Sequence, residues 1–152
     1  MSDLTELITG LPCFKAPSNI TPLGGGITNT NVTVEDEDCK YVVRIGSDIA
    51  EHGVMRWNEL ALSQAAYKLG ISPKVIYHKT GVLVLEFIDA YTLDEAAVRE
   101  PKNLKRIINV VAKTHRGIGK YLHSPILTFW PFQINQTYMS RLEEDGSSHV
   151  SK

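Results

Sequence analysis

The chain has 152 residues, of which 43% are hydrophobic and 22% charged, so it is long enough and apolar enough to bury a core. Its net charge is -1, from 16 basic and 17 acidic residues, and without a basic block we expect no nucleic-acid partner. No apolar run approaches the roughly 20 residues of a membrane span, and the N-terminus lacks a signal-peptide pattern. We therefore expect a soluble, cytoplasmic protein whose two cysteines, Cys13 and Cys39, are free thiols.

The first half of the chain predicts a short helix, three strands and a longer helix. Asp3 and Glu6 have the spacing of a capping box, which favours a helix over residues 4–8. Runs of β-branched and apolar residues predict strands at 20–23, 30–35 and 39–45, the last two joined by a polar turn at 36–38. Apolar residues at helical spacing predict a helix from Arg56 onward, and Gly70 is a suitable residue to end it.

The second half predicts one more hairpin, at 75–78 and 82–87, and after it helices only. Thr92 and Glu95 are spaced as a capping box for a short helix, which Pro101 ends while it opens the next one. That next helix carries an apolar stripe that we expect to face a core: Leu104, Ile107, Ile108, Val111, His115 and Ile118. A last helix is predicted within 130–146, and residues 146–152 are expected to form a disordered tail.

The order of the elements indicates the fold class. Strands gathered early and helices gathered late are typical of an α+β arrangement and not of a doubly wound parallel sheet. The helices from Thr92 onward are expected to belong to a second lobe.

Three consecutive glycines, Gly24, Gly25 and Gly26, separate two of the predicted strands. Such a run leaves backbone N–H groups uncovered and lets the chain approach a ligand closely, and phosphate oxygens are the usual ligand. Thr28 and Asn29 add side-chain donors beside it. A plain hairpin or bulge that needs positive φ explains the glycines about equally well.

Arg44 lies within an otherwise apolar strand, one hairpin after the glycines. The alternation of side chains along a strand puts it on the face of Val42, opposite to Tyr41 and Val43. Glu59 follows on the next helix, where its carboxylate can reach back to the guanidinium. A solvated arginine is the simple alternative, but a cation held by a carboxylate near a glycine loop is how kinases of the protein-kinase type hold phosphates.

Three stretches together resemble the choline/ethanolamine kinase branch of the aminoglycoside phosphotransferase-like kinases: PLGGGITNTNVTVEDEDCKYVVRI, RWNELALSQAAYKLGISPKVIY and GVLVLEFIDAYTLD. The motifs GG-I-T-N, V-R-I, R-x-x-E and E-F-I occur in order, and the match runs from about residue 11 to about residue 146. The resemblance implies a protein kinase-like N-terminal lobe, with an antiparallel sheet of about five strands and one helix. On this basis residues 1–88 form the nucleotide-binding lobe, and residues 89–145 form the hinge and the first helices of the catalytic lobe.

The resemblance also implies a binding site for ATP, used as Mg-ATP by the full-length family. Residues from Gly24 to Asn29 would cover the phosphates, namely Gly24, Gly25, Gly26, Thr28 and Asn29. Arg44 would contact the phosphates, with Glu59 as its partner on the helix. The carbonyl of Glu86 and the N–H of Ile88 would bind adenine, so the side chain of Glu86 has no required part. Val43 and Leu85 are candidates to face adenine, although core packing is the favoured interpretation of both.

His115 matches a histidine at the end of this helix in similar proteins. Because it lies on the apolar stripe, a hydrogen-bonded core histidine is favoured over a catalytic one.

The catalytic motif of the similar kinases, H-x-D-x-x-x-x-N, has no counterpart in this chain. Histidines occur at 52, 78, 115, 123 and 149, and none is followed two residues later by aspartate. We therefore expect no catalytic residue, no metal ligand and no kinase activity from this chain alone. A fragment of a longer kinase is the favoured explanation, and a short protein kept for nucleotide binding or protein interaction is the alternative.

The partners expected are a nucleotide and, only with a catalytic lobe, a small alcohol or amino alcohol. Choline, ethanolamine, thiamine and aminoglycosides are not distinguished by the sequence. The apolar stripe, if left open, also allows self-association.

Overall fold

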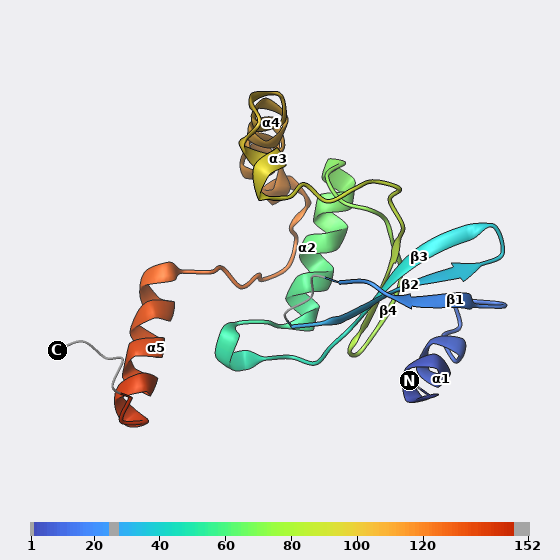
Figure 1. Ribbon diagram of the computed structural model, residues 1–152. Coiled ribbons are helices and arrows are strands. Elements are labelled where there is room, and N and C mark those ends of the chain that lie inside the picture. Colours follow the sequence, from blue (N-terminus) through green and yellow to red (C-terminus); the bar gives the residue numbers. More distant parts are fainter. Residues whose placement is uncertain (1, 25–27, 148–152) are drawn as a thin grey trace.

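The structure is a computed structural model that describes residues 2–24 and 28–147. Its elements in chain order are α1 (Ser2–Thr9), β1 (Ser18–Pro22), β2 (Thr30–Asp36), β3 (Cys39–Ile45), the 3-10 helix η1 (Ala50–His52), α2 (Arg56–Leu69), β4 (Val75–Lys79), β5 (Val82–Glu86), α3 (Glu95–Arg99), α4 (Pro101–Gly117), the 3-10 helix η2 (Ile118–Tyr121) and α5 (Pro131–Glu144). Figure 1 shows the strands gathered into one sheet and the later helices outside it. The predicted α+β class is therefore confirmed.

The sheet is antiparallel and has the order β1-β2-β3-β5-β4. The β2–β3 hairpin is paired along its whole length, from Thr30 opposite Ile45 to Asp36 opposite Cys39. Only two residues close it, and Glu37 has a left-handed φ of 52°, which tight hairpin turns require. Asp36 was predicted to belong to the turn, and instead it is a buried residue of β2.

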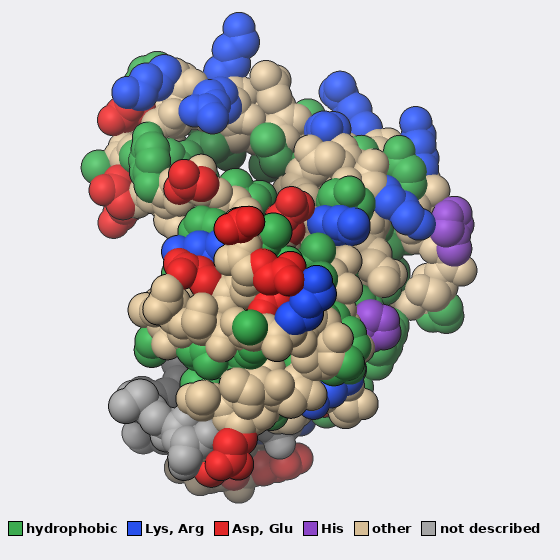
Figure 2. Space-filling view, turned by 90° about the vertical axis from the view of Figure 1, so that its right-hand side faces the viewer, with side chains coloured by type: hydrophobic (Ala, Val, Ile, Leu, Met, Phe, Trp, Pro, Cys, Tyr) green, Lys and Arg blue, Asp and Glu red, His purple; other side chains and the backbone are tan. Residues whose placement is uncertain are grey.

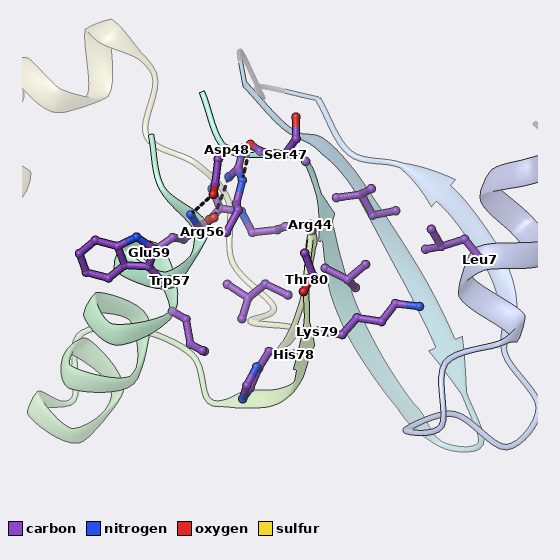
Figure 3. A pocket seen from close by; sticks show the side chains of 16 residues that line it. Leu7, Arg44, Ser47, Asp48, Arg56, Trp57, Glu59, His78, Lys79 and Thr80 are labelled. Carbon is purple, nitrogen blue, oxygen red and sulfur yellow. Dashed lines mark hydrogen bonds and ion pairs between the residues drawn. The ribbon is translucent and has the colours of Figure 1, made fainter. Parts of the chain in front are cut away.

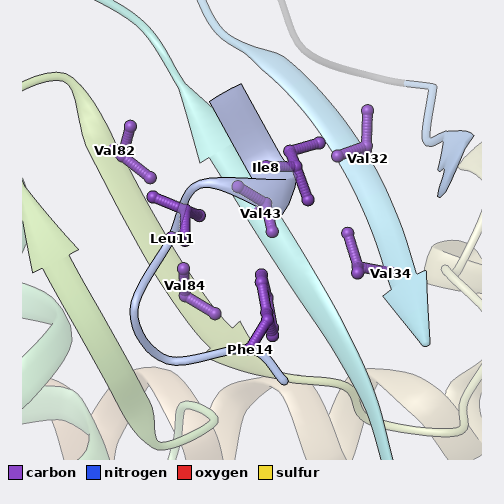
Figure 4. Packing of buried hydrophobic residues seen from close by; sticks show 8 residues of the cluster. All are labelled: Ile8, Leu11, Phe14, Val32, Val34, Val43, Val82 and Val84. Atoms are coloured by element: carbon purple, nitrogen blue, oxygen red, sulfur yellow. The ribbon is translucent and has the colours of Figure 1, made fainter. Parts of the chain in front are cut away.

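The main core lies between α1 and one face of the sheet. Figure 4 shows the buried side chains that form it: Ile8, Leu11 and Phe14 from the N-terminal segment, and Val32, Val34, Val43, Val82 and Val84 from the strands. The valines occupy alternate positions, as one buried face of a pleated strand requires. Asp3 lies in the first turn of α1, so its predicted capping position is off by at least one residue.

The long helix α2 lies on the opposite face of the sheet (Figure 3). It ends at Gly70, whose φ of 73° is left-handed and whose N–H donates to the carbonyl oxygens of Ala66 and Tyr67. Glycine adopts this conformation without steric strain, because it has no Cβ atom. The predicted end of the helix is confirmed.

The short helix α3 begins differently from the prediction. Asp94 is its N-cap, and an oxygen of its side chain accepts a 2.7 Å hydrogen bond from the N–H of Ala97. Thr92 precedes this N-cap, so it does not occupy the capping position that we predicted. Aspartate caps at least as well as threonine, and its charge suits the helix N-terminus. Pro101 occupies the first turn of α4, as expected.

The apolar stripe of α4 does not face a core among the described residues. Leu104, Ile108 and Val111 are 47%, 55% and 46% exposed, and the only buried residue of α4 is Asn103. His115 is exposed as well, so the prediction of a buried core histidine is wrong. The reason is visible in Figure 1, where α3 and α4 lie beyond the end of α2 and away from the sheet. Figure 2 shows basic side chains gathered at the same end of the molecule.

The last helix, α5, stands apart from the sheet in Figure 1. Contacts of this region with the rest of the described chain include His52 Nδ1, which lies 2.9 Å from Tyr138 Oη, and the Asn58 side chain, which is hydrogen-bonded to the backbone of Leu127. Gly146 and Ser147 close α5 through backbone hydrogen bonds, while the rest of the tail predicted to be disordered lies outside the described residues. No helix in the described part of the chain is long and apolar enough to cross a membrane.

Candidate functional site

The sheet face opposite α1 carries the polar residues of interest. Because side chains alternate along β3, Val43 packs into the α1 core while Arg44 points to the other side. The register places Asn31 of β2 and Leu83 of β5 directly beside Arg44. This face and α2 together form the candidate site.

Arg44 and Glu59 form the ion pair that the sequence suggested. Nη1 of Arg44 lies 2.9 Å from Oε1 of Glu59, and the two side chains are 34% and 18% exposed. This oxygen accepts no well-aligned hydrogen bond, so the contact is an ion pair by distance. The partly exposed guanidinium keeps N–H groups available for another anion. The contact is present, and the phosphate-binding role of Arg44 and Glu59 stays a prediction.

Arg56 is a second cation at the same carboxylate. No separate role for it was predicted from the sequence. Its Nη1 lies 2.7 Å from Oε2 of Glu59, and its side chain is only 16% exposed. Its Nε donates to the carbonyl oxygen of Ser47 and its Nη2 to that of Thr28, at 2.8 and 3.2 Å. The i,i+3 spacing of Arg56 and Glu59 in the R-x-x-E motif was the signal for their contact.

Gly46 lies in the loop after β3, against this cluster. A Cβ atom added to it would lie 2.7 Å from Nη2 of Arg56 and 2.9 Å from Oδ1 of Asn29. The side-chain oxygens of Asn29 and Asn31 are buried without hydrogen-bond partners among the described residues. The side-chain amide of asparagine can rotate by half a turn, which exchanges the positions of its oxygen and nitrogen. Both side chains can therefore present either an acceptor or a donor here.

The glycine run is described only in part. Gly24 is exposed, and a Cβ atom there would meet no atom within 4 Å. Gly25 and Gly26 lie outside the described residues, so their predicted contact with phosphates stays a prediction. Thr28 is half-buried, and its carbonyl accepts the hydrogen bond from Arg56.

The segment after β5 includes a residue, Ile88, whose backbone N–H is available as a donor. The N–H groups of Glu86 and Phe87 donate to the carbonyls of Lys74 and Lys40, at 2.9 and 3.1 Å. The N–H of Ile88 makes no hydrogen bond to another described backbone group, and its residue is 56% exposed. The Ile88 N–H is thus available for the predicted contact with adenine, and that contact stays a prediction.

The two candidates to face adenine separate onto opposite faces. Val43 is fully buried among the residues that pack on α1, so core packing is the correct interpretation for it. Leu85 pairs directly with Val42, which puts both on the face of Arg44. Val42, and not Val43, therefore shares the face of Leu85 and Arg44.

A cavity of about 770 Å³ lies between α2, the loop after β3 and the β4–β5 hairpin. Figure 3 shows Arg44, Arg56 and Glu59 close together at its edge, with Trp57 on the side of α2. The cavity is at one end of β5, at Val82, whereas Phe87 and Ile88 follow the other end. The site is thus polar at the arginine end and apolar around Leu83 and Trp57.

The described residues do not form a metal centre. No group of three or more histidine, cysteine, aspartate or glutamate side chains is placed to hold an ion within residues 2–24 and 28–147. Glu59 is the carboxylate of the cluster, and two arginines surround it. This set of residues therefore does not fit a magnesium ion.

Comparisons with known proteins agree on one family. The family model described as choline/ethanolamine kinase matches residues 20–151. An ethanolamine kinase from Plasmodium vivax has a similar structure, with a TM-score of 0.63 and 23% sequence identity over 98% of this chain. The match covers 42% of that protein, so this chain spans less than half of its length. A search of curated protein sequences returns no match.

Proposed function

Since this chain belongs to the choline/ethanolamine kinase family, we propose that it is the ATP-binding lobe of a kinase that phosphorylates the hydroxyl group of a small amino alcohol. The observation that carries the proposal is the Arg44–Glu59 ion pair at the face of the sheet opposite α1. Choline or ethanolamine is the substrate class that the family favours, and thiamine or an aminoglycoside is the alternative.

The partly exposed guanidinium of the cluster suits a polyphosphate. The side chains of Arg44, Arg56 and Glu59 carry two positive charges and one negative charge, and the carboxylate of Asp48, which accepts a hydrogen bond from the N–H of Arg56, brings the sum to zero. The phosphate contact therefore depends on the partly exposed guanidinium of Arg44 and not on an excess of positive charge. Arg44 is the more exposed of the two arginines, and it is the one we assign to the phosphates. Charge-assisted hydrogen bonds from a guanidinium to phosphate oxygens are strong and directional. Glu59 fixes the direction in which that guanidinium points.

Adenine is assigned to the hinge segment at the other end of β5. The unpaired N–H of Ile88 donates to the ring, and the carbonyl of Glu86 accepts from the adenine amino group. Val42 and Leu85 lie side by side on the same face and provide apolar contact area for the base. The side chain of Glu86 is exposed and takes no part.

ATP supplies the phosphoryl group in this proposal, and this chain supplies only its binding. The sequence holds no H-x-D-x-x-x-x-N motif, and the described residues do not fit a magnesium ion. We therefore propose that the chain by itself binds nucleotide weakly and does not phosphorylate choline or ethanolamine. The expected dissociation constant is on the order of millimolar, which corresponds to about -4 kcal/mol.

A titration with MgATP, followed by the NMR chemical shifts of the backbone amides, tests the phosphate contact. Arg44→Ala should weaken binding by about tenfold or more, because it removes charge-assisted hydrogen bonds. Arg99→Ala is the matched control, since Arg99 pairs with Glu95 on an exposed face of α3. Equal affinity of the Arg44→Ala variant and the parent chain would remove the assigned role of Arg44.

The adenine contact has its own test. Ile88→Pro removes the N–H that we assign to adenine, whereas Glu86→Ala changes only an exposed side chain beside it. We expect loss of MgATP binding in the first variant and unchanged binding in the second. Loss in both, or in neither, would contradict the assignment of adenine to the backbone of this segment.

A second candidate function rests on the exposed stripe of α4. Leu104, Ile108 and Val111 lie on one face of the helix and are about half exposed, which is typical of a surface that binds another protein. We propose that two copies of the chain associate through it. Sedimentation should show a dimer that Ile108→Glu converts to a monomer, and a monomeric parent chain would contradict this.

A further inference from the structure

Arg56 contacts three parts of the chain that are far apart in sequence. Its Nη2 donates to the carbonyl of Thr28, at the C-terminal end of the glycine loop, and its Nε donates to the carbonyl of Ser47, after β3. Its Nη1 binds Glu59 one turn further along α2. One guanidinium therefore connects the glycine loop, the β3–α2 loop and the carboxylate that pairs with Arg44.

The backbone of the same residue is also fixed. The N–H of Arg56 donates to Oδ1 of Asp48, so the start of α2 is tied to the β3–α2 loop from two sides. With 16% of its side chain exposed, Arg56 is less exposed than Arg44. A side chain this enclosed, with three of its five N–H donors engaged, is less suited than Arg44 to bind a ligand directly.

The position of the guanidinium depends on the glycine beside it. Gly46 is held by the hydrogen bond of its N–H to the carbonyl of Gly81, at 3.0 Å. A Cβ atom there would lie 2.7 Å from Nη2 of Arg56, which is closer than real Cβ contacts allow. Because Nη2 is the nitrogen that reaches Thr28, a methyl group at position 46 would displace this bond.

We propose that Arg56 is a positioning residue for the phosphate end of the nucleotide site. By holding the backbone of Thr28 against α2, and Glu59 against Arg44, it fixes the segment just before β2 relative to the phosphate-binding guanidinium. The inference deepens the proposed function and rests on it. A lysine cannot replace this arginine, because a single ammonium group lacks the planar fork that reaches three acceptors in different directions.

The experiment compares the binding of ATP and of adenosine by NMR titration, in the parent chain and three variants. Arg56→Gln and Arg56→Lys should each weaken ATP binding by about tenfold and leave adenosine binding unchanged, because Arg56 acts at the phosphate end only. Gly46→Ala should have the same effect while Arg56 is still present. Arg99→Gln, on the exposed face of α3, is the control and should change neither affinity.

A double variant separates positioning from general destabilisation. If Gly46→Ala and Arg56→Gln act through the same guanidinium, the double variant should bind ATP no more weakly than the weaker single variant. The Nη2 protons of Arg56 give a further signal, since their hydrogen bond to the carbonyl of Thr28 should slow their exchange with water in the parent chain and not in Gly46→Ala. Equal loss of ATP and adenosine binding would indicate a merely structural role and overturn the inference.

Three further outcomes would contradict the inference and leave the proposed function unaffected. They are parent-like ATP binding by Arg56→Gln, parent-like ATP binding by Arg56→Lys, and additive losses of affinity in the double variant. Binding of neither ATP nor adenosine by the parent chain would remove the proposed nucleotide site itself, and this inference with it.

Discussion

Asn31 lies directly opposite Arg44 in the β2–β3 ladder, and its side-chain oxygen is buried without a hydrogen-bond partner among the described residues. A buried polar atom without a partner lowers stability, and functional sites are where proteins keep such groups. We predict that Asn31→Val raises the free energy of unfolding by about 1 kcal/mol, because it removes that cost and adds a residue suited to a strand. Urea unfolding measures this change.

The same variant should weaken MgATP binding, because valine has no polar group to offer beside the guanidinium of Arg44. Thr30→Val is the control, since Thr30 is an exposed residue of the same strand. It should leave both stability and binding nearly unchanged. A loss of stability in Asn31→Val would show that the amide has a partner that the structure does not contain, such as a bound water.

Asp36 connects the hairpin to the segment that follows α1. Its Oδ1 accepts hydrogen bonds from the backbone N–H groups of Lys15 and Ala16, at 3.1 and 2.6 Å, and the residue is only 6% exposed. Hydrogen bonds to a charged acceptor contribute about 1.5–3 kcal/mol. Asp36→Ala should lower the free energy of unfolding by about that amount.

Chemical denaturation of both Asp36→Ala and Asp38→Ala checks this prediction. Asp38 is an exposed residue of the neighbouring turn, so its substitution should lower the free energy of unfolding only slightly. Similar decreases in the free energy of unfolding for the two variants would mean that the buried contacts of Asp36 do not stabilise the fold.

Gly70 ends α2 in a left-handed conformation. Gly70→Ala should lower the free energy of unfolding by about 1 kcal/mol, because alanine is strained at positive φ. Thermal unfolding measures the change against Gly119→Ala, where φ is not positive and no atom lies within 4 Å of the added methyl group. A drop in melting temperature as large in the control would refute the conformational explanation.

The two cysteines are free, as predicted, and they differ in environment. Burial raises the pKa of the Cys13 thiol, and the negative charge of Asp36 raises it further. A raised pKa means less thiolate at any pH below it, and the thiolate is the form that reacts. We predict that iodoacetamide alkylates Cys13 more slowly than the exposed Cys39. The rate at Cys13 should keep rising at pH values above the pKa of an ordinary thiol.

Mass spectrometry after timed alkylation between about pH 7 and pH 10 follows each cysteine separately. The same measurement in urea is the control, because unfolding should bring the two rates together. Equal rates in the folded chain would contradict the assigned burial of Cys13.

The sequence predicted the elements that depend on local patterns. The strands of the β2–β3 hairpin, the helix from Arg56 to Gly70 and the proline at the start of α4 all follow from periodicity or from a single capping residue. The alternation along β3 also separated Arg44 correctly from Val43, and it would have favoured Val42 as the residue on the adenine side. Core packing, the favoured interpretation of Val43, is confirmed, and its alternative role beside adenine went against that alternation.

Residues whose environment depends on distant parts of the chain were predicted less well. Asp36 looked like a turn residue, because nothing local indicates that the backbone of Lys15 and Ala16 comes to its carboxylate. The stripe of α4 has a core-like period, but Leu104, Ile108, Val111 and His115 are exposed, because the described chain covers this helix only in part. Periodicity shows that a face is apolar and does not show what covers it.

By itself, the sequence determined the order of strands and helices and the polar face of the sheet, because each follows from spacing along a strand or a helix. The pairing of Arg44 with Glu59 was implied by the resemblance to the kinase family. Only the tertiary structure decided that Arg56 binds the same carboxylate and reaches the carbonyls of Thr28 and Ser47. The physical reason is that backbone carbonyls carry no signature in a sequence, so a donor that binds them is recognised only once folding has brought three distant segments to one guanidinium.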